Sequence, residues 1–317
     1  MTDTQNEVFK TPVNKIRLFE HGAPGSQNLK LTRKYYTEDM PDGRVKHIVQ
    51  NITDPDIVPY IPDGIGNSTD RQRIPAVLII PGGAFRRLVY NFEGEDVAKW
   101  LNSMGIAAFV LECRLPSDEH DNAEDVPLID AMRAMRVIRG RAQEFGIDEA
   151  KIGVMGFSAG GFMAALLSTA YESDVYADYK YKDEYDKLSA RPDFAVCSYP
   201  VISIDDCIEA GKRYMSEEQV LERISDSKAK ILHKYNPDKL VRPDMPPVFI
   251  CETDDDRTTL SENSVGFYMA ARKAGVSAEL HIFRTGGHGY GCGGDFAQTG
   301  EWKVLFTKGI KRIGIIS

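Results

Sequence analysis

The chain has 317 residues, of which 42% are hydrophobic and 27% are charged, and its 39 basic and 47 acidic side chains give a net charge of −8. This is the composition of an ordinary globular protein that can bury a large core. The calculated pI near 5.4 and the lack of long basic runs argue against nucleic acid or an anionic membrane surface as the main partner. Both of those partners favour clustered Lys and Arg side chains.

The chain begins with polar and acidic residues and lacks the basic start and apolar stretch of a secretory signal, so we expect no export. No run of residues approaches the roughly 18 apolar residues of a membrane-spanning helix. The 5 cysteines are scattered and form no C-x-x-C pair. This pattern fits reduced thiols, and we expect a cytoplasmic protein.

Short β-branched runs alternate with helical patterns along the chain, which indicates parallel strands joined by crossover helices. Most of these runs are too apolar to have a solvated face. The predicted strands are 76–80, 106–111, 151–157, 193–199, 247–252 and 278–284. The predicted helices are 94–104, 127–145, 159–171, 261–274 and 299–311. We therefore expect an α/β fold with a mostly parallel central sheet and helices on both faces.

Three segments depart from this alternation. Residues 1–70 carry weaker strand signals, such as 45–52, which we expect to add antiparallel strands at an edge of the sheet. Residues 171–190 hold five tyrosines among charged side chains, and residues 203–245 hold two predicted helices. We interpret both as insertions over one end of the sheet, the second as a small lid. Without repeats or linkers, we expect one domain over 1–317.

The chain contains one G-x-S-x-G pattern, in which Gly156 and Gly160 flank Ser158. It lies between an apolar strand and a helical stretch, where flanking glycines permit a sharp turn that exposes the serine hydroxyl. The following helix directs its positive end toward a developing anion. This context predicts Ser158 as a nucleophile.

A serine hydroxyl needs a base, and the base needs an orienting carboxylate. In this fold class the order along the chain is serine, acid, histidine. His288 lies in a glycine-rich loop just past the last predicted strand, so it can reach the carboxyl end of the sheet. His281 lies inside that strand and is expected to be a packing residue. We therefore predict His288 as the base.

The acid should follow the preceding strand, where Asp254, Asp255 and Asp256 are consecutive. A metal site would need more converging oxygen ligands than the sequence places nearby, so no metal is predicted. We expect one aspartate to turn toward His288. The residues alone leave the choice between Asp255 and Asp256 open.

An acyl-transfer site also needs N–H donors for the oxyanion. The segment Pro81-Gly82-Gly83-Ala84-Phe85 ends the first strong strand, where such a loop belongs. Its small residues let backbone amides approach a substrate. We expect Gly82 and Gly83 to supply donors, with the amide of Ala159 completing the oxyanion hole.

Over about residues 74–312 the sequence resembles the α/β-hydrolase superfamily, and within it the bacterial esterase/lipase group similar to acetylxylan and acetyl esterases. The segments that carry the resemblance are 81–85, 130–134, 146–148, 156–161, 192–195, 262–264, 272–276 and 286–289. The resemblance implies Ser158 as nucleophile and His288 as base. Alignment on Asn263-Ser264 places the family's usual acid at Asp256.

Some positions depart from the family pattern. The oxyanion loop has Pro81 and Ala84 where hormone-sensitive-lipase-like relatives have His and a third Gly, which favours the sugar-esterase branch. Arg257-Thr258-Thr259-Leu260 replaces the commoner sequence after the acid, and Cys113 stands where relatives often have Tyr. The 203–245 insertion does not match the usual lid closely. Substrate choice therefore cannot be transferred from the family.

These features predict a serine carboxylesterase that cleaves short, acetyl-like esters of polar or carbohydrate-like alcohols through an acyl-enzyme, without metal or organic cofactor. The partner is a small-molecule ester, and the oligomeric state, a homo-oligomer included, stays open. Activity should rise with pH as His288 loses its proton. The alternatives are an amide hydrolase on the same triad and a non-catalytic ligand receptor. The tyrosines of 171–185 offer sugar-stacking faces, or else form a surface excursion.

Overall fold

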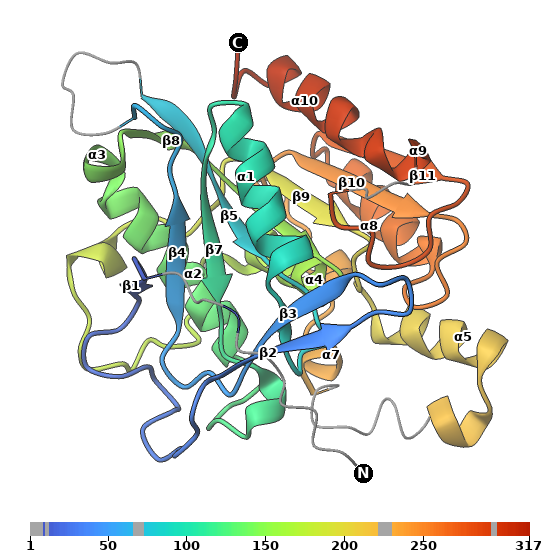
Figure 1. Ribbon diagram of the computed structural model, residues 1–317, viewed down its shortest axis with the longest axis horizontal. Coiled ribbons are helices and arrows are strands. Elements are labelled where there is room, and N and C mark those ends of the chain that lie inside the picture. Colours follow the sequence, from blue (N-terminus) through green and yellow to red (C-terminus); the bar gives the residue numbers. More distant parts are fainter. Residues whose placement is uncertain (1–8, 10–12, 66–72, 221–229, 293–296) are drawn as a thin grey trace.

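The computed structural model describes residues 9, 13–65, 73–220, 230–292 and 297–317. Within them lies an eight-stranded sheet (Figure 1). Its order is β1 (Ile16–Arg17), β4 (Asp56–Tyr60), β7 (Ala107–Glu112), β5 (Ile74–Ile80), β8 (Ile147–Phe157), β9 (Ala195–Ser198), β10 (Val248–Thr253) and β11 (Ala278–Phe283). The strands from β7 to β11 are parallel, whereas β4 and β1 are antiparallel additions at one edge. The predicted mostly parallel sheet is confirmed.

All six predicted strands are present within a few residues of their expected bounds. Every residue of β7, β9 and β10 is buried, which explains why their sequences lack alternating polar positions. The edge strand β11 is only partly buried. The apolar runs therefore predicted the strands correctly, because helices cover most of the sheet on both faces.

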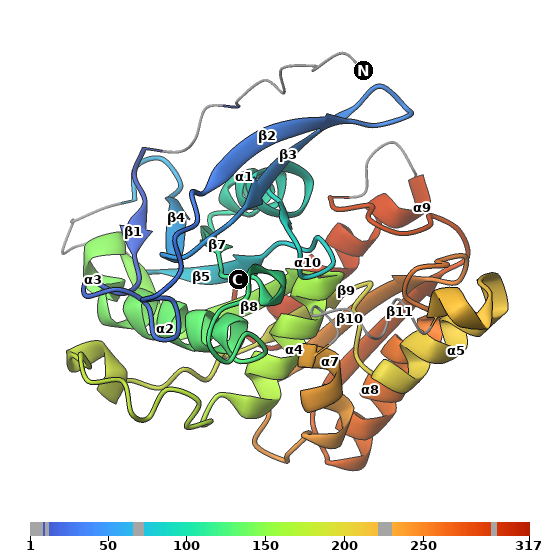
Figure 2. The same ribbon diagram turned by 90° about the horizontal axis from the view of Figure 1, so that it is seen from below.

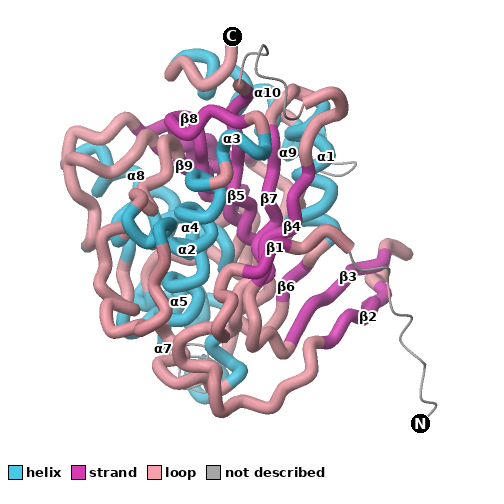
Figure 3. Tube along the Cα trace, turned by 90° about the vertical axis from the view of Figure 1, so that its left-hand side faces the viewer, coloured by secondary structure: helices cyan, strands magenta, loops and turns pink. Residues whose placement is uncertain are grey.

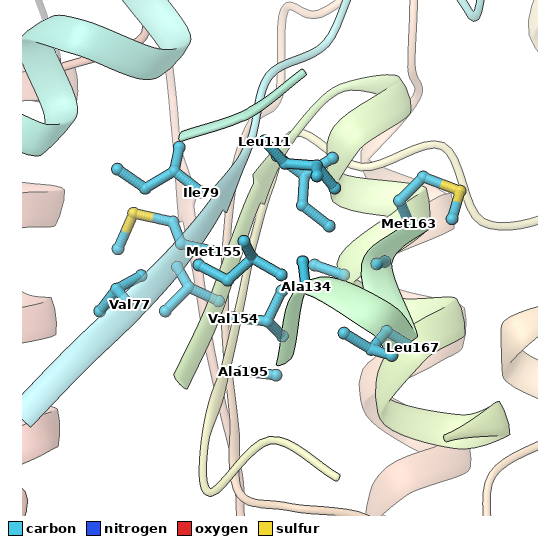
Figure 4. Packing of buried hydrophobic residues seen from close by; sticks show 14 of the residues in the cluster. Val77, Ile79, Leu111, Ala134, Val154, Met155, Met163, Leu167 and Ala195 are labelled. Atoms are coloured by element: carbon cyan, nitrogen blue, oxygen red, sulfur yellow. The ribbon is translucent and has the colours of Figure 1, made fainter. Parts of the chain in front are cut away.

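Helices α1 (Asp96–Ser103) and α10 (Trp302–Arg312) cover one face of the sheet, and Trp100 and Trp302 meet edge to face with ring centroids 5.0 Å apart. The other face is covered by α2 (Val126–Gly140), α3 (Ala142–Phe145), α4 (Ala159–Ala170) and α8 (Ser261–Lys273) (Figure 2). Figure 4 shows Ala134 of α2 and Leu167 of α4 beside Val154 of the sheet. The predicted helices are confirmed, except that 127–145 divides at Arg141 into α2 and α3, and 299–311 divides at Glu301 into the end of α9 (Ala297–Gly300) and α10.

The prediction that residues 45–52 extend the main sheet is wrong. That segment forms β3 (Val45–Gln50), which pairs with β2 (Lys34–Asp39) and β6 (Leu88–Val89) in a separate three-stranded sheet (Figure 3). The edge positions belong to β1 and β4 instead. Both strands have two fully or almost fully buried residues, Ile48 and Val49 in β3 and Ile57 and Val58 in β4, so local burial does not distinguish them and only the tertiary pairing assigns each strand to its sheet.

The tyrosine-rich segment packs along α2. Arg133 of α2 forms ion pairs with Asp183, which precedes the short helix η3 (Glu184–Lys187), and with Asp186 inside it. The Tyr176 hydroxyl donates to Asp186 at 2.8 Å. Tyr176 is buried. These contacts hold residues 171–190 against α2 through their tyrosines and aspartates. The packing does not support a sugar-stacking role for the tyrosines.

Residues 203–245 contribute α5 (Ile204–Tyr214), α7 (Lys230–Lys234) and η5 (Pro237–Lys239), while 221–229 lie outside the described residues. The predicted lid is thus described only in part. The remaining short elements are η1 (Asn91–Glu95), η2 (Pro116–Asp118) and α9 (Ala297–Gly300). Among the helices of the described chain, none combines the length and apolarity needed to span a bilayer.

Candidate active site

Loops from distant parts of the sequence meet at one edge of the sheet. Strands β5, β8, β10 and β11 are parallel members of one sheet, so their carboxyl ends lie on the same side. They lead respectively into Pro81, Ser158, the run of aspartates at 254–256, and the glycine-rich loop that carries His288. The sheet thereby gathers the predicted site residues.

Ser158 lies on a strained bend between β8 and α4, with φ 54° and ψ −118°. A Cβ on Gly156 would lie 1.9 Å from the carbonyl oxygen of Gly160, and one on Gly160 would lie 1.9 Å from that of Ile80. Both positions therefore require glycine. The Ser158 N–H donates to the Ser198 carbonyl at 3.0 Å, which holds the bend against β9.

His288 bridges Ser158 and Asp256. Its Nε2 lies 2.9 Å from Ser158 Oγ, and its Nδ1 lies 2.6 Å from Asp256 Oδ2. Because Nδ1 faces a carboxylate, it carries the proton of the neutral ring, and Nε2 accepts from the serine hydroxyl. Ser158 and His288 lie 130 positions apart in the sequence, and the structure brings them together with Asp256.

Asp256, not Asp255, is the carboxylate that faces His288. Asp256 is 2% exposed, and its Oδ1 accepts the N–H groups of Thr258 at 2.7 Å and Thr259 at 3.0 Å. Asp255 is exposed and accepts the Gly287 N–H at 2.8 Å, so it fastens the histidine loop from outside. His281 bonds to Glu279 on its own strand.

The electrostatics favour a charged Asp256. Burial raises its pKa, but the hydrogen bond and charge of His288, together with the amides of Thr259 and Thr258, outweigh burial and leave the pKa lowered. Glu252 is buried nearby, and both burial and the charge of Asp256 raise its pKa well above the ordinary value. Of these two carboxyl groups, Asp256 therefore keeps the negative charge that can stabilise an imidazolium.

The oxyanion loop differs from expectation at Gly82. Its N–H donates to Glu93 Oε2 at 2.8 Å, so this amide is not free to meet a substrate oxygen. The predicted role of Gly82 as a donor is not supported for this reason. In the described part of the chain, the N–H groups of Gly83 and Ala159 make no hydrogen bond to protein. These two amides remain as candidate oxyanion donors.

Sequence reasoning missed Glu93, Tyr199 and Thr259. Glu93 lies among acidic residues that resemble the exposed start of a helix, and Tyr199 directly follows β9. The Thr259 hydroxyl donates to Asp256 Oδ2 at 3.0 Å. The unusual residues after Asp256 were a signal for Thr259, since they mark a local change in the acid loop, but no sequence pattern singled out Glu93 or Tyr199.

A small pocket lies beside Gly82 and Ala159. Its side chains include Phe85, Leu115, Pro127 and Met163. The pocket has a volume of about 10 Å³, which is roughly the space of one water molecule. It therefore leaves no room for a large group beside Ala159.

The mostly parallel sheet, the serine on its strand–helix bend, and the histidine and carboxylate on later loops define an α/β-hydrolase. The chain belongs to the BD-FAE family, whose model matches residues 65–270. This confirms the superfamily that the sequence motifs indicated.

Three similar proteins are informative. An acetylxylan esterase of Xylanibacter ruminicola is 31% identical over 220 residues, which are 69% of this chain and 41% of that protein. The endo-1,4-beta-xylanase B of Butyrivibrio fibrisolvens is 31% identical over 221 residues, 69% of this chain and 33% of its own. The chain thus spans well under half the length of these curated relatives. An acetyl ester-xyloside bifunctional hydrolase of Caldicellulosiruptor lactoaceticus matches with TM-score 0.70 and 34% identity, covering 96% of this chain and 97% of that one.

Proposed function

We propose that the protein is a carboxylesterase that removes short acyl groups, acetyl above all, from polar or carbohydrate-like alcohols, using Ser158, His288 and Asp256. The observation that carries the proposal is the continuous hydrogen-bonded series from Ser158 Oγ through His288 to the buried Asp256, at 2.9 and 2.6 Å. Both distances lie within the reach required for proton transfer and for orientation of the base.

In the proposed mechanism, Ser158 Oγ attacks the ester carbonyl while its proton passes to His288 Nε2. The negative charge of Asp256 stabilises the resulting imidazolium. The oxyanion accepts from the N–H groups of Gly83 and Ala159. Collapse of the tetrahedral intermediate expels the alcohol, which takes the proton from His288. A water molecule then gives its proton to His288 and attacks the acyl-enzyme. When the second tetrahedral intermediate collapses, Ser158 Oγ leaves with that proton from His288, and the carboxylic acid is released.

The acyl and alcohol preferences have separate support. The pocket beside Gly82 and Ala159 has a volume of only about 10 Å³, so it leaves no room there for a long acyl chain, which supports a short acyl group. Two of the similar proteins are named for acetyl esters, one an acetylxylan esterase and one an acetyl ester-xyloside hydrolase. Their names make acetylated xylo-oligosaccharides the first natural substrates to test.

The test compares p-nitrophenyl acetate hydrolysis by the wild type and by Ser158→Ala. We expect kcat to fall by at least about a thousandfold, because triad residues act as a unit. A fluorophosphonate probe should label the wild type and not the variant. Activity that survives the substitution would refute the proposed nucleophile.

Substrate panels then test the specificity. Acyl chains from two to eight carbons should give the highest kcat/KM at the short end, and a maximum at eight carbons would contradict the acetyl preference. Matched ester and amide substrates address the alternative reaction, since the same triad can cleave both bonds. Faster cleavage of the amide would replace the esterase proposal with an amidase.

A further inference from the structure

Glu93 is a buried acid that the proposed reaction does not use. It is 5% exposed and lies in η1, behind the oxyanion loop. Burial of an acid without an ion-pair partner is costly, so its position calls for strong compensating hydrogen bonds. The structure provides two such bonds, one to each carboxylate oxygen.

The first bond ties Glu93 to the oxyanion loop. Glu93 Oε2 accepts the Gly82 N–H at 2.8 Å. A Cβ placed on Gly82 would lie 2.9 Å from Ser158 Cβ, so Gly82 fills the space between Glu93 and the nucleophile. The next amide along the chain is that of Gly83. Any movement of Gly82 would therefore also displace the Gly83 N–H, which is a proposed oxyanion donor.

The second bond leads toward His288. Glu93 Oε1 accepts from the Tyr199 hydroxyl at 2.8 Å, and the same hydroxyl accepts the Gly291 N–H at 3.0 Å. Gly291 follows His288 by three residues in the same loop. The ring of Tyr199 also meets the imidazole edge to face, with centroids 5.0 Å apart. Tyr199 is fully buried and has φ 37°, a conformation that a non-glycine residue keeps only in a firmly held setting.

The element that carries Glu93 is itself anchored to the small second sheet. Asn91 Oδ1 accepts the His47 N–H at 3.0 Å, and Asn91 Nδ2 donates to the Val45 carbonyl at 2.8 Å. The Tyr90 N–H donates to the His47 carbonyl at 2.8 Å. Strand β3 thus fixes η1 on the side away from the nucleophile, so Glu93 has a rigid support.

We propose that Glu93 and Tyr199 are positioning residues for ester hydrolysis, because their carboxylate–hydroxyl bond fixes the oxyanion loop relative to the loop of His288. This inference rests on the proposed function of Ser158, His288 and the Gly83 amide. Neither residue donates to the substrate. They hold the donor and the base at the separation that one tetrahedral intermediate requires, which is the kind of preorganisation that lowers a barrier.

The substitution Glu93→Gln tests the hydrogen bond between Glu93 and Tyr199 with little change in the shape of the side chain. A glutamine has one acceptor oxygen, whereas Glu93 accepts two donors, so either the Gly82 N–H or the Tyr199 hydroxyl loses its acceptor. Removal of an oxyanion donor outright costs about 10²–10³ in kcat. Since this substitution displaces a donor without removing it, we expect kcat for p-nitrophenyl acetate to fall by about 10- to 100-fold, with KM changed less than about threefold.

Tyr199→Phe tests the other end and keeps the ring against His288. We expect a loss of kcat in the same range. The double variant Glu93→Gln/Tyr199→Phe should lose less than the product of the two single losses, because both substitutions disrupt the Glu93–Tyr199 bond, while Tyr199→Phe also removes the acceptor of the Gly291 N–H. If Glu93→Gln fails to fold, Tyr199→Phe still decides the question.

Tyr176→Phe is the matched control. It also removes a buried tyrosine hydroxyl that donates to a carboxylate at 2.8 Å, but on the α2 side of the domain. We expect its kcat to stay within about twofold of wild type. The inference is overturned if kcat is unchanged in both site variants, or if Tyr176→Phe lowers it equally, while Ser158→Ala abolishes activity. Activity that survives Ser158→Ala would instead overturn the proposed function and this inference with it.

Discussion

Replacing Asp256 with asparagine should disable the base without disturbing the loop. The carboxylate accepts the N–H groups of Thr258 and Thr259 on Oδ1, and it faces His288 Nδ1 with Oδ2. An asparagine can keep its oxygen toward the two amides, which then places its NH2 group against His288. A flipped side chain would set the NH2 group against two N–H donors, so the first orientation is favoured.

The expected loss of kcat in Asp256→Asn follows from a change in the tautomer of His288. Facing an NH2 group, His288 Nδ1 becomes the acceptor and the ring proton moves to Nε2, which lies 2.9 Å from Ser158 Oγ. A protonated Nε2 cannot accept the serine proton. The same substitution in a Ser-His-Asp protease lowers kcat by about 10⁴. We expect a loss of about 10³ to 10⁴, which corresponds to roughly 4–5.5 kcal/mol of transition-state stabilisation.

The assay is kcat/KM for p-nitrophenyl acetate, measured for wild type, Asp256→Asn and Asp255→Asn. Asp255→Asn is the matched control, because it makes the same change one residue away and keeps an oxygen for the Gly287 N–H. We expect the control to stay within about threefold of wild type. An Asp256→Asn variant that kept more than about a tenth of the activity, or a larger loss in Asp255→Asn, would refute the assignment of the acid.

Two stability predictions concern residues away from the site. Burial raises the pKa of Asp118 to about 6. Because this folded-state pKa lies above the ordinary value, the folded protein favours the protonated form of Asp118 over the charged form. The contribution of Asp118 to the free energy of unfolding is therefore complete below about pH 4 and is lost as pH rises through 6. Asp118→Asn should therefore add about 1 kcal/mol at pH 8, after allowance for partial exposure, and little at pH 4, in urea unfolding. Arg133→Met should cost about 1–2 kcal/mol because it removes the ion-pair partner shared by Asp183 and Asp186, although Asp186 keeps Arg136 and the Tyr176 hydroxyl, and it should leave kcat within about twofold. Equal pH dependence for Asp118→Asn and wild type, or a large loss of kcat in Arg133→Met, would contradict these accounts.

The parallel core could be predicted from sequence because burial on two faces leaves a direct compositional mark. The strand at 247–252 has no polar alternation, and β10 is buried along its whole length. The antiparallel additions left no comparable mark. Residues 45–52 and β4 both showed weak strand patterns, and only tertiary packing placed β4 in the main sheet and β3 in the second one.

The residues at the centre of the site could also be predicted, because their backbone requirements appear as motifs. Gly156 and Gly160 occur where a side chain would overlap neighbouring backbone, so the pattern around Ser158 is dictated by geometry. His288 lies in a loop whose glycines are equally visible. The residues alone left the choice between Asp255 and Asp256 open, since two adjacent carboxylates of one loop differ only in the direction that each faces, and only the family resemblance pointed to Asp256.

Gly82 shows why a motif can identify a loop and still misassign its amides. The sequence indicated small residues whose N–H groups can approach a substrate, but the use of each N–H depends on which acceptor lies behind it. That acceptor is the buried Glu93, whose element η1 is bonded to β3, a strand some forty residues earlier. A polar residue in a position that is buried by distant segments carries no local signature. The supporting residues of an active site are therefore harder to find from sequence than the residues that react.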